Sequence, residues 1–446
     1  MHRVAVIGSG IAGLGAAWRL ATSAPEVRVT LLEAGAHFGG HANTVDLALD
    51  GVVAGVDTGF LVFNRRTYPE LTRLFAALRV DCAPADMGFS VQVPRADGSP
   101  GLEWSGSSLG ALFAQYGNLA RPRFWRMLAD IERFNRLSTA LALDGGADPA
   151  QTIGDFLARY RFGDAFRDDY LLPMLGSIWS CSTRWMLRFP AATMIRFCHN
   201  HGLLQIQDRP AWMTVRGGSR RYVERIVAAI PDARRRVPVR GVRRVPAGVE
   251  IVLPKGTERF DAAVLACHSD QALALLGNQA SAAERGVLGA IGYQSNRAVL
   301  HTDRAVLPSR RNAWAAWNYE RAPDPDGEGQ RVCIHYLLNR LQPLPWARPV
   351  IVSLNPARAI DPSQVRAEFS YEHPVFDHAA IVAQQDVAAL QGLRRTWYCG
   401  AWCGYGFHED GLRAGLRVAD GIVAWLRGGT PATTPAGTPA PEEAAA

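Results

Sequence analysis

The sequence predicts an α/β fold built on a parallel sheet, and three observations support this prediction. An apolar run, Val4 to Ile7, is typical of a buried strand and leads into the glycine-rich turn Gly8 to Gly13. A helical segment and a second apolar run, Val27 to Leu32, follow, as in a strand–helix–strand unit. Short strand-like segments recur at 237–268 and 394–402, after long stretches of different character. We therefore expect one sheet assembled from separated parts of the chain.

The N-terminal turn has the spacing of a dinucleotide-binding site. Gly8 permits the tight turn, Gly10 lets the backbone approach a pyrophosphate, and Gly13 lets the helix pack close to the sheet. The free N–H groups at the start of the helix favour phosphate groups. Glu33 follows the second strand and can accept hydrogen bonds from a ribose diol. Because the turn lies between two predicted strands, the segment predicts a dinucleotide site.

A leader or a membrane anchor is the alternative interpretation of this apolar N-terminus. Arg19 and the glycines would weaken a spanning helix, and the strand starts at residue 3 without a basic leader. No other apolar run has spanning length. We expect a cytoplasmic protein, with peripheral contact to the inner membrane face left open.

Composition excludes several classes of protein. The chain has 446 residues, of which 48% are hydrophobic and 20% charged, which is ordinary for a globular protein of two or three packed units. Its seven scattered cysteines favour reduced thiols, and no His/Cys spacing suggests a metal site. The net charge of +7 suits an anionic surface or an acidic substrate, but no nucleic-acid module is recognisable. We expect neither a bound metal nor a nucleic-acid partner.

The order of the segments suggests a cofactor domain interrupted by a substrate domain. Helical periodicity dominates 91–204, and a mixed α+β pattern covers 276–390, so these two pieces would form the substrate domain. The tail, 428–446, is rich in Pro, Thr and Ala, and we expect it to be disordered. The cofactor domain would then consist of residues 1–90, 205–275 and 391–427.

Later motifs extend the site beyond a single dinucleotide turn. A second glycine turn, Gly39 to Asn43, follows Glu33 closely, and Asp57 to Phe60 follows a short strand. With these motifs the chain resembles the flavin amine oxidase, protoporphyrinogen oxidase and phytoene desaturase superfamily over residues 1 to about 427. The resemblance implies FAD as the cofactor. It also implies a glutathione-reductase-like, Rossmann-type FAD domain made of discontinuous segments, with an inserted mixed α+β substrate domain.

The resemblance carries over to individual positions. His41 stands where the superfamily usually has an arginine, and Ala401 stands where it usually has an acid. Val239 matches a valine whose backbone meets the adenine, and a helix starting near Gly411 would point its N–H groups at the flavin. The cofactor-binding positions expected from the motif and the resemblance are Gly8, Ser9, Gly10, Ala12, Gly13, Glu33, Ala34, Gly40, His41, Thr58, Gly59, Val239, Gly400, Gly411 and Leu412.

A closer resemblance concerns the substrate. The segments 39–47, 56–75, 201–226 and 404–412 look like those of bacterial FAD-dependent proteins associated with cyclopropane-fatty-acid-synthase-like methyltransferases. Desaturases of the furan-fatty-acid pathway also look related. The resemblance implies an oxidoreductase that desaturates a membrane-lipid acyl chain, such as a methyl-branched one. It implies a lipid or other apolar substrate, hydride transfer to flavin N5 and a methyltransferase as functional partner.

Three groups of residues are candidates for the chemistry. The first contains Trp402, Tyr405, Phe407 and His408, because the superfamily geometry puts this segment near the flavin ring; packing of the cofactor is the alternative. Glu409 and Asp410 there suit helix capping. The second is Cys198 to His201 beside Arg209, and the third comprises Tyr336, Asn339 and Arg340 near Trp314 and Trp317. From these groups we select His408, Tyr405 and His199 as catalytic candidates.

One helical stripe allows two interpretations. Phe124, Trp125, Met127 and Leu128 are flanked by Arg121, Arg123 and Arg126, a pattern that suits either an anionic bilayer or ordinary core packing. Two other functions also remain open at this point: a flavin amine oxidase acting on a small amine, and a non-catalytic flavoprotein partner of a lipid methyltransferase. Flavin reduction by an amine would favour the amine oxidase. Full activity of the methyltransferase partner without the cofactor would favour the non-catalytic role.

Overall fold

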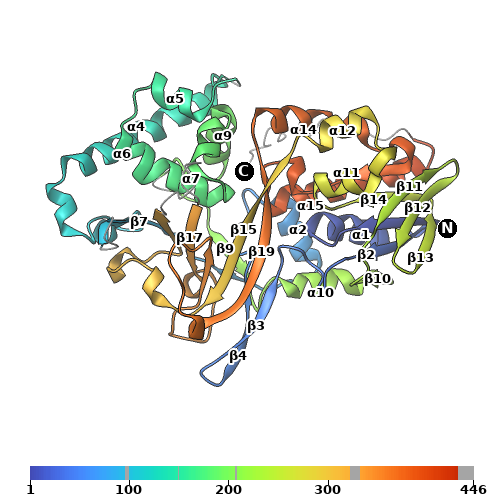
Figure 1. Ribbon diagram of the computed structural model, residues 1–446, viewed down its shortest axis with the longest axis horizontal. Coiled ribbons are helices and arrows are strands. Elements are labelled where there is room, and N and C mark those ends of the chain that lie inside the picture. The colour runs from blue at the N-terminus through green and yellow to red at the C-terminus, as the bar shows by residue number, and fades with distance from the viewer. Residues whose placement is uncertain (96–99, 149, 206–207, 322–331, 430–446) are drawn as a thin grey trace.

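The computed structural model describes residues 1–95, 100–148, 150–205, 208–321 and 332–429. Most of the tail expected to be disordered, residues 430–446, lies outside this range. Figure 1 shows two regions: a nucleotide-binding region on the right and a helical region on the left. The long strands β15 (Gly292–His301) and β19 (Val365–Val375) run between them. The chain is thus organised as two regions joined by a shared sheet.

A five-stranded parallel sheet forms the centre of the nucleotide-binding region. The pairings join the N-terminal strands to strands from the middle and the end of the chain, because β14 pairs with both β1 and β20. This confirms the prediction of an α/β fold with a sheet assembled from separated segments. In spatial order the strands are β10 (Asp232–Arg234), β2 (Val27–Leu32), β1 (His2–Ile7), β14 (Ala262–Leu265) and β20 (Thr396–Tyr398).

Both faces of this sheet are buried, as parallel sheets require. Along β1, Val4 and Val6 face one hydrophobic cluster and Ala5 and Ile7 the other, which is the alternation of a strand. The first face is covered by α1 (Ile11–Ser23), α2 (Pro69–Ala77), α10 (Arg220–Ala228) and α15 (His408–Leu426). The second face is covered by α11 (Ser269–Leu276), α12 (Ala282–Leu288), α14 (His378–Leu390) and the meander β11 (Gly241–Val245), β12 (Gly248–Leu253) and β13 (Gly256–Phe260).

Small residues let α1 and α15 approach each other closely. A Cβ added to Gly415 would lie 2.1 Å from the Ala12 carbonyl oxygen, and one added to Gly15 would lie 2.6 Å from Leu412. Any larger side chain at these positions would push the two helices apart. The close contact places the start of α15 beside the glycine turn. That start is His408, three residues earlier than the expected start near Gly411.

A mixed seven-stranded sheet forms the other large layer. β7 pairs in parallel with β16 and antiparallel with β8, although the sequence suggested that helical structure begins after residue 90. The expected helical structure is thus preceded by a hairpin, β7 and β8, which completes a sheet whose other strands come from a distant segment of the chain. The order is β19, β15, β18 (Ile351–Leu354), β17 (Val332–Leu337), β16 (Trp317–Arg321), β7 (Phe89–Pro94) and β8 (Pro100–Ser105).

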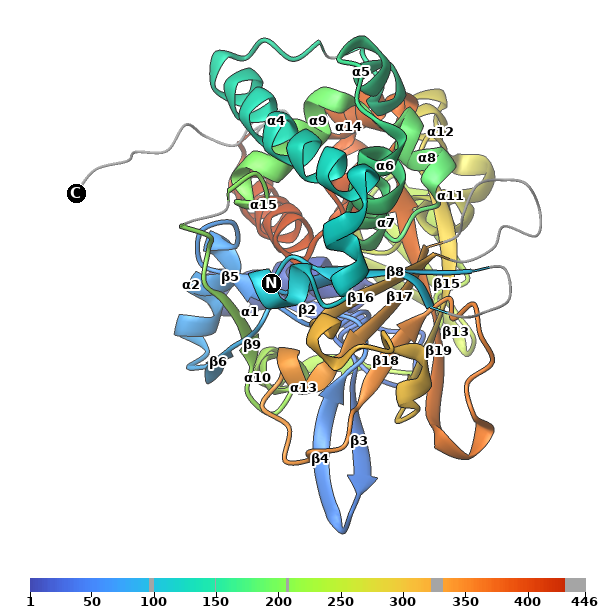
Figure 2. The same ribbon diagram turned by 90° about the vertical axis from the view of Figure 1, so that its left-hand side faces the viewer.

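The helical region lies above this sheet, as Figure 2 shows. On its longest helix, Phe124, Met127 and Phe134 are buried and pack inward, whereas Trp125 of the same stripe is 49% exposed. The region contains α3 (Leu109–Leu112), η1 (Tyr116–Ala120), α4 (Pro122–Asp144), α5 (Ile153–Arg159), α6 (Asp164–Phe166), the π-turn η2 (Arg167–Leu171), α7 (Leu172–Trp179), α8 (Thr183–Arg188) and α9 (Ala191–Asn200).

Smaller elements connect these layers. The hairpin β3 (Thr44–Leu49) and β4 (Val52–Asp57) projects from the body in Figure 1, and β5 (Phe63–Asn64), β9 (Trp212–Val215) and β6 (Cys82–Pro84) form a three-stranded sheet. The remaining helices are η3 (Gly277–Gln279), η4 (Arg304–Val306), η5 (Arg311–Ala313), α13 (Leu338–Leu341), η6 (Pro362–Gln364), η7 (Leu393–Arg395) and η8 (Ala401–Cys403). Among the described residues, none of the helices combines the length and hydropathy needed to span a bilayer.

Candidate cofactor and substrate cavity

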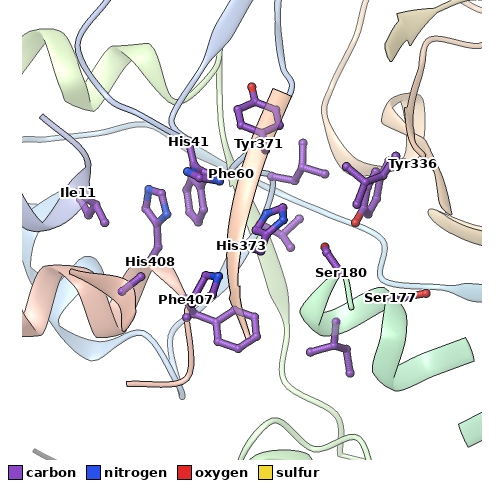
Figure 3. A pocket seen from close by; sticks show the side chains of 18 of the residues that line it. Ile11, His41, Phe60, Ser177, Ser180, Tyr336, Tyr371, His373, Phe407 and His408 are labelled. Carbon is purple, nitrogen blue, oxygen red and sulfur yellow. The ribbon is translucent and has the colours of Figure 1, made fainter. Parts of the chain in front are cut away.

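One large cavity runs from the glycine turn into the space between the helical region and the seven-stranded sheet. Its volume is about 1620 Å³. Pockets for a single small ligand usually occupy roughly 300–1,000 Å³, so this cavity has room for more than one. Figure 3 shows its middle part, where Ile11, His408 and Phe60 lie on one side and Tyr336, Ser177 and Ser180 on the other. The cavity therefore connects both regions of the molecule.

The glycine turn at one end is a backbone surface. Gly8 has a φ of +101°, and an added Cβ would lie 2.6 Å from the Ala266 carbonyl oxygen. An added Cβ on Gly13 would lie 1.9 Å from the Gly8 carbonyl oxygen, which keeps helix and turn in direct contact. At Gly10, by contrast, no atom lies within 4 Å of that position. The open space at Gly10, beside the N-terminus of α1, is where an anion can approach.

Glu33 lies at the end of β2 and lines the cavity. Its Oε2 accepts hydrogen bonds from the Ser9 backbone N–H at 3.0 Å and the Ser9 hydroxyl at 2.5 Å. Its Oε1 accepts a hydrogen bond from the Gly35 N–H at 2.6 Å. These three donors fix the carboxylate beside the turn. The position is the one that the sequence predicts for a ribose acceptor.

The second glycine turn lies directly against the first. The Gly39 N–H donates to the Ser9 carbonyl at 3.0 Å, and Gly40, His41, Thr58 and Gly59 all line the cavity. The Nε2 of His41 is buried without a hydrogen-bond partner among the described residues. Burial lowers the pKa of His41 to about 4, so its ring is neutral at pH 7. His41 therefore lines the cavity as a neutral ring whose Nε2 is shielded from solvent.

Residues from the middle and the end of the chain complete this end of the cavity. The Val237 N–H donates to the Glu33 carbonyl at 2.8 Å, which places the adjoining Val239 in the wall. Gly400 and Ala401 line the cavity as well. The wall also contains Phe407 and His408 of the first candidate group. The remaining predicted cofactor positions in the wall are Gly8, Ser9, Gly10, Ala12 and Ala34.

Three predicted cofactor positions are not in the wall. Gly13, Gly411 and Leu412 lie behind it: Leu412 is fully buried, and an added Cβ on Gly411 would lie 2.9 Å from Ile11. Gly411 and Leu412 pack α15 against Ile11 and Gly15 of α1, and Gly13 packs α1 against the turn at Gly8. These residues therefore position the turn and the start of α15 and do not line the space.

His408, selected as a catalytic candidate, lines the cavity at the first turn of α15. Its ring is stacked on Phe60 with the centroids 3.8 Å apart, and its Nε2 lies 2.7 Å from the Tyr222 hydroxyl. Burial lowers its pKa to about 3. A neutral ring that is clamped in this way is suited to shape the wall more than to accept a proton through Nε2, because Tyr222 already occupies that nitrogen.

The other two catalytic candidates lie outside the wall. Neither Tyr405 nor His199 lines the cavity, which is where a residue that contacts the substrate would lie. The neighbour His201 lines the cavity instead, with its ring stacked 3.9 Å from that of Phe197. Burial lowers the pKa of His201 to about 4. Residues two apart on a helix point in nearly opposite directions, so His199 and His201 cannot both face the cavity.

Two residues of β19 were missed by the sequence analysis. Tyr371 and His373 lie two residues apart on this strand, and therefore on the same face, and both point into the cavity (Figure 3). The Tyr371 hydroxyl lies 2.7 Å from the Thr58 hydroxyl, and the rings of His373 and His41 are 5.2 Å apart. Strand periodicity was a usable signal, but it does not say which of the two faces is the inner one.

The tautomer of His373 is set by a chain of amides. Asn355 donates from Nδ2 to the Val332 carbonyl, which can only accept, and also to Oδ1 of Asn296. The Nδ2 of Asn296 therefore faces Nδ1 of His373 at 2.9 Å and donates to it. Nδ1 is an acceptor, so the proton of the neutral ring is on Nε2. Burial lowers the pKa of His373 to about 3, which keeps the ring neutral.

Only part of the third group of candidates lies in the wall of the cavity. Tyr336 and Trp317 line the cavity, whereas Asn339, Arg340 and Trp314 do not. The Nε1 of Trp317 is buried without a hydrogen-bond partner among the described residues, as are Nε1 of Trp104 and Oδ1 of Asn135, which also line the cavity. Each of these three atoms is shielded from solvent, so the side chains line the cavity without presenting these atoms to it.

A separate polar cluster lies in the interior, outside this cavity. Glu320, Cys333 and His335 bring ligand atoms within 4.8 Å of one another, although the sequence spacing suggested no metal site. His335 Nε2 lies 3.0 Å from Glu320, its Nδ1 lies 2.7 Å from the Ser353 hydroxyl, and Arg358 pairs with Glu320. The guanidinium and the imidazole lower the pKa of the Glu320 carboxyl against the effect of burial. These hydrogen bonds account for the cluster as a structural network.

Comparisons with known proteins agree with the architecture. The model of the NAD(P)-binding Rossmann-like domain matches residues 6–78. No curated protein sequence matches the chain. Among solved structures, the chain is similar to a CLA-producing fatty acid isomerase from P. acnes, with 17% identity and a TM-score of 0.63 over 95% of this chain and 99% of that one.

Two oxidases are similar to the same extent. Putrescine oxidase bound to putrescine has 14% identity and a TM-score of 0.67, over 95% of this chain and 99% of that one. Cyclohexylamine oxidase from Brevibacterium oxydans IH-35A has 14% identity and a TM-score of 0.64, over 96% and 99%. At this identity a likeness shows the fold. The chain therefore has the fold of these oxidases and this isomerase over nearly its whole length, with a Rossmann-type nucleotide-binding domain at its N-terminal end.

Proposed function

We propose that the protein is an FAD-dependent oxidoreductase that desaturates a lipid acyl chain. The observation that carries this proposal is the continuous cavity of about 1620 Å³, which joins a dinucleotide-binding turn to an apolar chamber. A nucleotide-binding protein without further chemistry would not need the second chamber. The fold shared with oxidases that act on putrescine and cyclohexylamine supports the reaction class.

The residues at the glycine-turn end fit a flavin dinucleotide. The open space at Gly10 suits the pyrophosphate, and the fixed carboxylate of Glu33 suits the ribose of the adenosine half. The wall formed by Gly40, His41 and Thr58 continues the site toward the substrate chamber. When bound, FAD would supply the hydride-accepting chemistry, which side chains cannot provide.

The chamber beyond suits an apolar chain. Its wall contains Leu128, Ile131, Met174, Ile178, Val352 and Leu354, from α4, α7 and β18. Such a lining excludes water and binds a hydrocarbon by the hydrophobic effect, at about 25 cal/mol for each Å² that is buried. The similarity to a fatty acid isomerase supports a chain of this kind as the substrate.

The protein's own side chains would orient the substrate. Tyr336, whose hydroxyl Figure 3 shows, lines the chamber and can hold a polar group of the substrate there. His373 presents Nε2–H as a hydrogen-bond donor, because Asn296 occupies its Nδ1. His373 and His41 are neutral at pH 7, so this part of the wall adds no positive charge next to a hydrocarbon.

The first test is anaerobic reduction of the purified holoprotein. We expect the protein to carry FAD and its absorbance to bleach with acyl lipids but not with small amines. Gly10→Asp should fold and lose the cofactor, because it places a carboxylate where the pyrophosphate approaches. Gly286→Ala, in open space on α12, is the matched control and should keep the flavin. Absence of FAD, or no bleaching with any acyl lipid, would refute the proposal.

An amine oxidase is the second candidate, and the similarity to two amine oxidases favours it. A cationic amine needs an anionic or aromatic partner, and Tyr336 and Trp317, whose rings are 5.0 Å apart, can supply an aromatic one. Bleaching by an amine and not by lipid would establish this function instead. A third result, full activity of a methyltransferase partner with Gly10→Asp, would establish a non-catalytic role.

A further inference from the structure

The cavity reaches the molecular surface at the end of β8. Gly106, Ser107, Ser108 and Leu109 line the cavity and are also exposed to solvent. Leu109, at the first position of α3, is 77% exposed. A large apolar side chain in this position is unfavourable in water, and it borders the opening of an apolar chamber. The opening is therefore a place where an apolar molecule can pass between the chamber and the surroundings.

Further exposed apolar side chains follow Leu109 along the chain. Tyr116 is 81% exposed and Leu119 50%, and they lie three apart on the 3₁₀ helix η1, where such residues share one face. Trp125, 49% exposed, follows on the first turns of α4. Its Nε1 donates to the Leu119 carbonyl at 2.9 Å, and its ring lies 5.6 Å from that of Phe113. These two contacts hold the exposed Trp125 side chain next to Leu119.

This surface differs from the one that the sequence suggested. Of the predicted stripe, Phe124 and Met127 are 3% and 1% exposed and belong to the core, and Leu128 lines the cavity. Only Trp125 of that stripe is at the surface. We call the exposed set of Leu109, Tyr116, Leu119 and Trp125 the mouth surface.

The charge of the segment is one-sided. Between Trp104 and Ala129 the sequence has three arginines and no acidic residue. Arg121 donates to the neutral side chains of Gln115 and Asn118, so its charge is not cancelled. Arg123 pairs with Asp169, and Arg126 has no carboxylate partner among the described residues. The apolar side chains are therefore accompanied by two uncompensated positive charges.

We propose that the mouth surface docks on an anionic phospholipid bilayer, with the opening at Leu109 facing the membrane. Bulky apolar and aromatic side chains next to arginines are the combination that binds the interface of anionic lipids. Each arginine near such a surface contributes about 1 kcal/mol, which corresponds to roughly a fivefold change in affinity. An acyl chain could then enter the chamber without crossing water. This last step rests on the proposed function, but the docking itself does not.

Vesicle flotation of the holoprotein tests the docking. We expect binding to vesicles that contain phosphatidylglycerol and roughly 25-fold weaker binding to pure phosphatidylcholine, because two arginines contribute about fivefold each. Tyr116→Ser with Leu119→Ser should abolish binding by removing apolar contacts, and Arg126→Glu should weaken it roughly 25-fold, because it changes the charge by two units. Matched controls are Val52→Ser with Val53→Ser, which are exposed on the β3–β4 hairpin, and Arg243→Glu on the outside of β11. Both controls should bind like the unchanged protein.

The outcomes separate docking from catalysis. If the holoprotein binds neither vesicle type, or if the control variants lose binding as strongly as the mouth variants, the docking proposal is wrong. Circular dichroism of each variant excludes loss of the fold as the cause. If vesicles bind but no acyl lipid bleaches the flavin, the docking stands and the proposed function fails. If detergent-dispersed lipid bleaches the flavin and no vesicle binds, the reverse holds.

Discussion

The two ends of the cavity are built in different ways. At the nucleotide end the wall is largely backbone, and its shape depends on Gly8 and Gly13, where an added Cβ would collide with backbone atoms. At the substrate end the wall consists of side chains, contributed by α4, α7, β16, β17, β18 and β19. A backbone site requires particular residues at fixed spacing within one segment, whereas a side-chain site can be formed by many combinations from distant segments. The first therefore leaves a motif in the sequence, and the second does not.

The largest effect is expected where helix and turn meet. Gly13→Ala would place a Cβ 1.9 Å from the Gly8 carbonyl oxygen, a distance that requires the backbone to move. Such overpacking costs about 1–3 kcal/mol or more, and we expect loss of both stability and flavin. Thermal unfolding and flavin content would measure this. Gly286→Ala serves as the control and should leave both unchanged. A stable, yellow Gly13→Ala protein would show that the nucleotide end does not depend on this close contact.

A smaller effect is expected from the polar part of the same end. Glu33→Gln keeps the shape but removes the charge that accepts three hydrogen bonds from Ser9 and Gly35. We expect FAD affinity to fall by roughly ten- to a hundredfold, since a hydrogen bond to a charged group contributes about 1.5–3 kcal/mol. Titration of the cofactor-free protein with FAD would measure the change. Equal affinity in both proteins would mean that the carboxylate does not contact the cofactor.

At the substrate end a single change should affect turnover and leave the cofactor in place. Tyr336→Phe removes a hydroxyl at the wall of the cavity but keeps an aromatic ring next to Trp317. We expect kcat/KM to fall about fivefold, the equivalent of one hydrogen bond of about 1 kcal/mol, with unchanged FAD affinity. Steady-state kinetics with the lipid that bleaches the flavin would measure it. A loss of FAD binding in this variant would mean that the two ends are not separate.

The smallest effect concerns pH. Burial lowers the pKa of His373 to about 3 and that of His41 to about 4, against about 6.5 in the unfolded chain. Between these values the unfolded chain binds more protons, so stability is fully present above pH 6.5 and is lost as the pH falls. We expect the cofactor-free protein to unfold more easily at pH 5 than at pH 7. His373→Asn should reduce this dependence by at most one proton, measured as the pH slope of the unfolding free energy. An unchanged slope would show that His373 is not buried in its neutral form.

The outcome for individual residues follows the same division. Gly10, Glu33 and Val239 lie in the wall where the motif and the resemblance place them. Tyr405 and His199 lie outside it, although a histidine and an aromatic residue near the flavin segment were reasonable choices. The direction of a side chain on α9 is set by how the helix rolls against its neighbours. That orientation depends on packing with distant elements, and no local pattern reports it.

The domain organisation shows an intermediate case. Most of the discontinuous parallel sheet was predictable, because β1, β2, β14 and β20 lie in strand-like segments bounded by turns. The edge strand β10 was not, since its sequence, Asp232 to Arg234, has no apolar run. The position of β7 and β8 in the seven-stranded sheet was not, since β7 pairs with β16 more than 200 residues away. The boundary at residue 90 and the others drawn from the sequence stay predictions, and limited proteolysis is suited to examine them.

By itself, the sequence determined the α/β class, the glycine turn and the carboxylate that follows it. These features depend on backbone geometry over about thirty residues, and local spacing records such geometry. Only the tertiary structure decided which side chains form the chamber, that Tyr371 and His373 face inward, and that Trp125, with Leu119, is at the surface while Phe124 is buried. The physical reason is that burial is a property of the packed whole. A residue's neighbours in space, and hence its charge and exposure, come from segments that are far away in the chain.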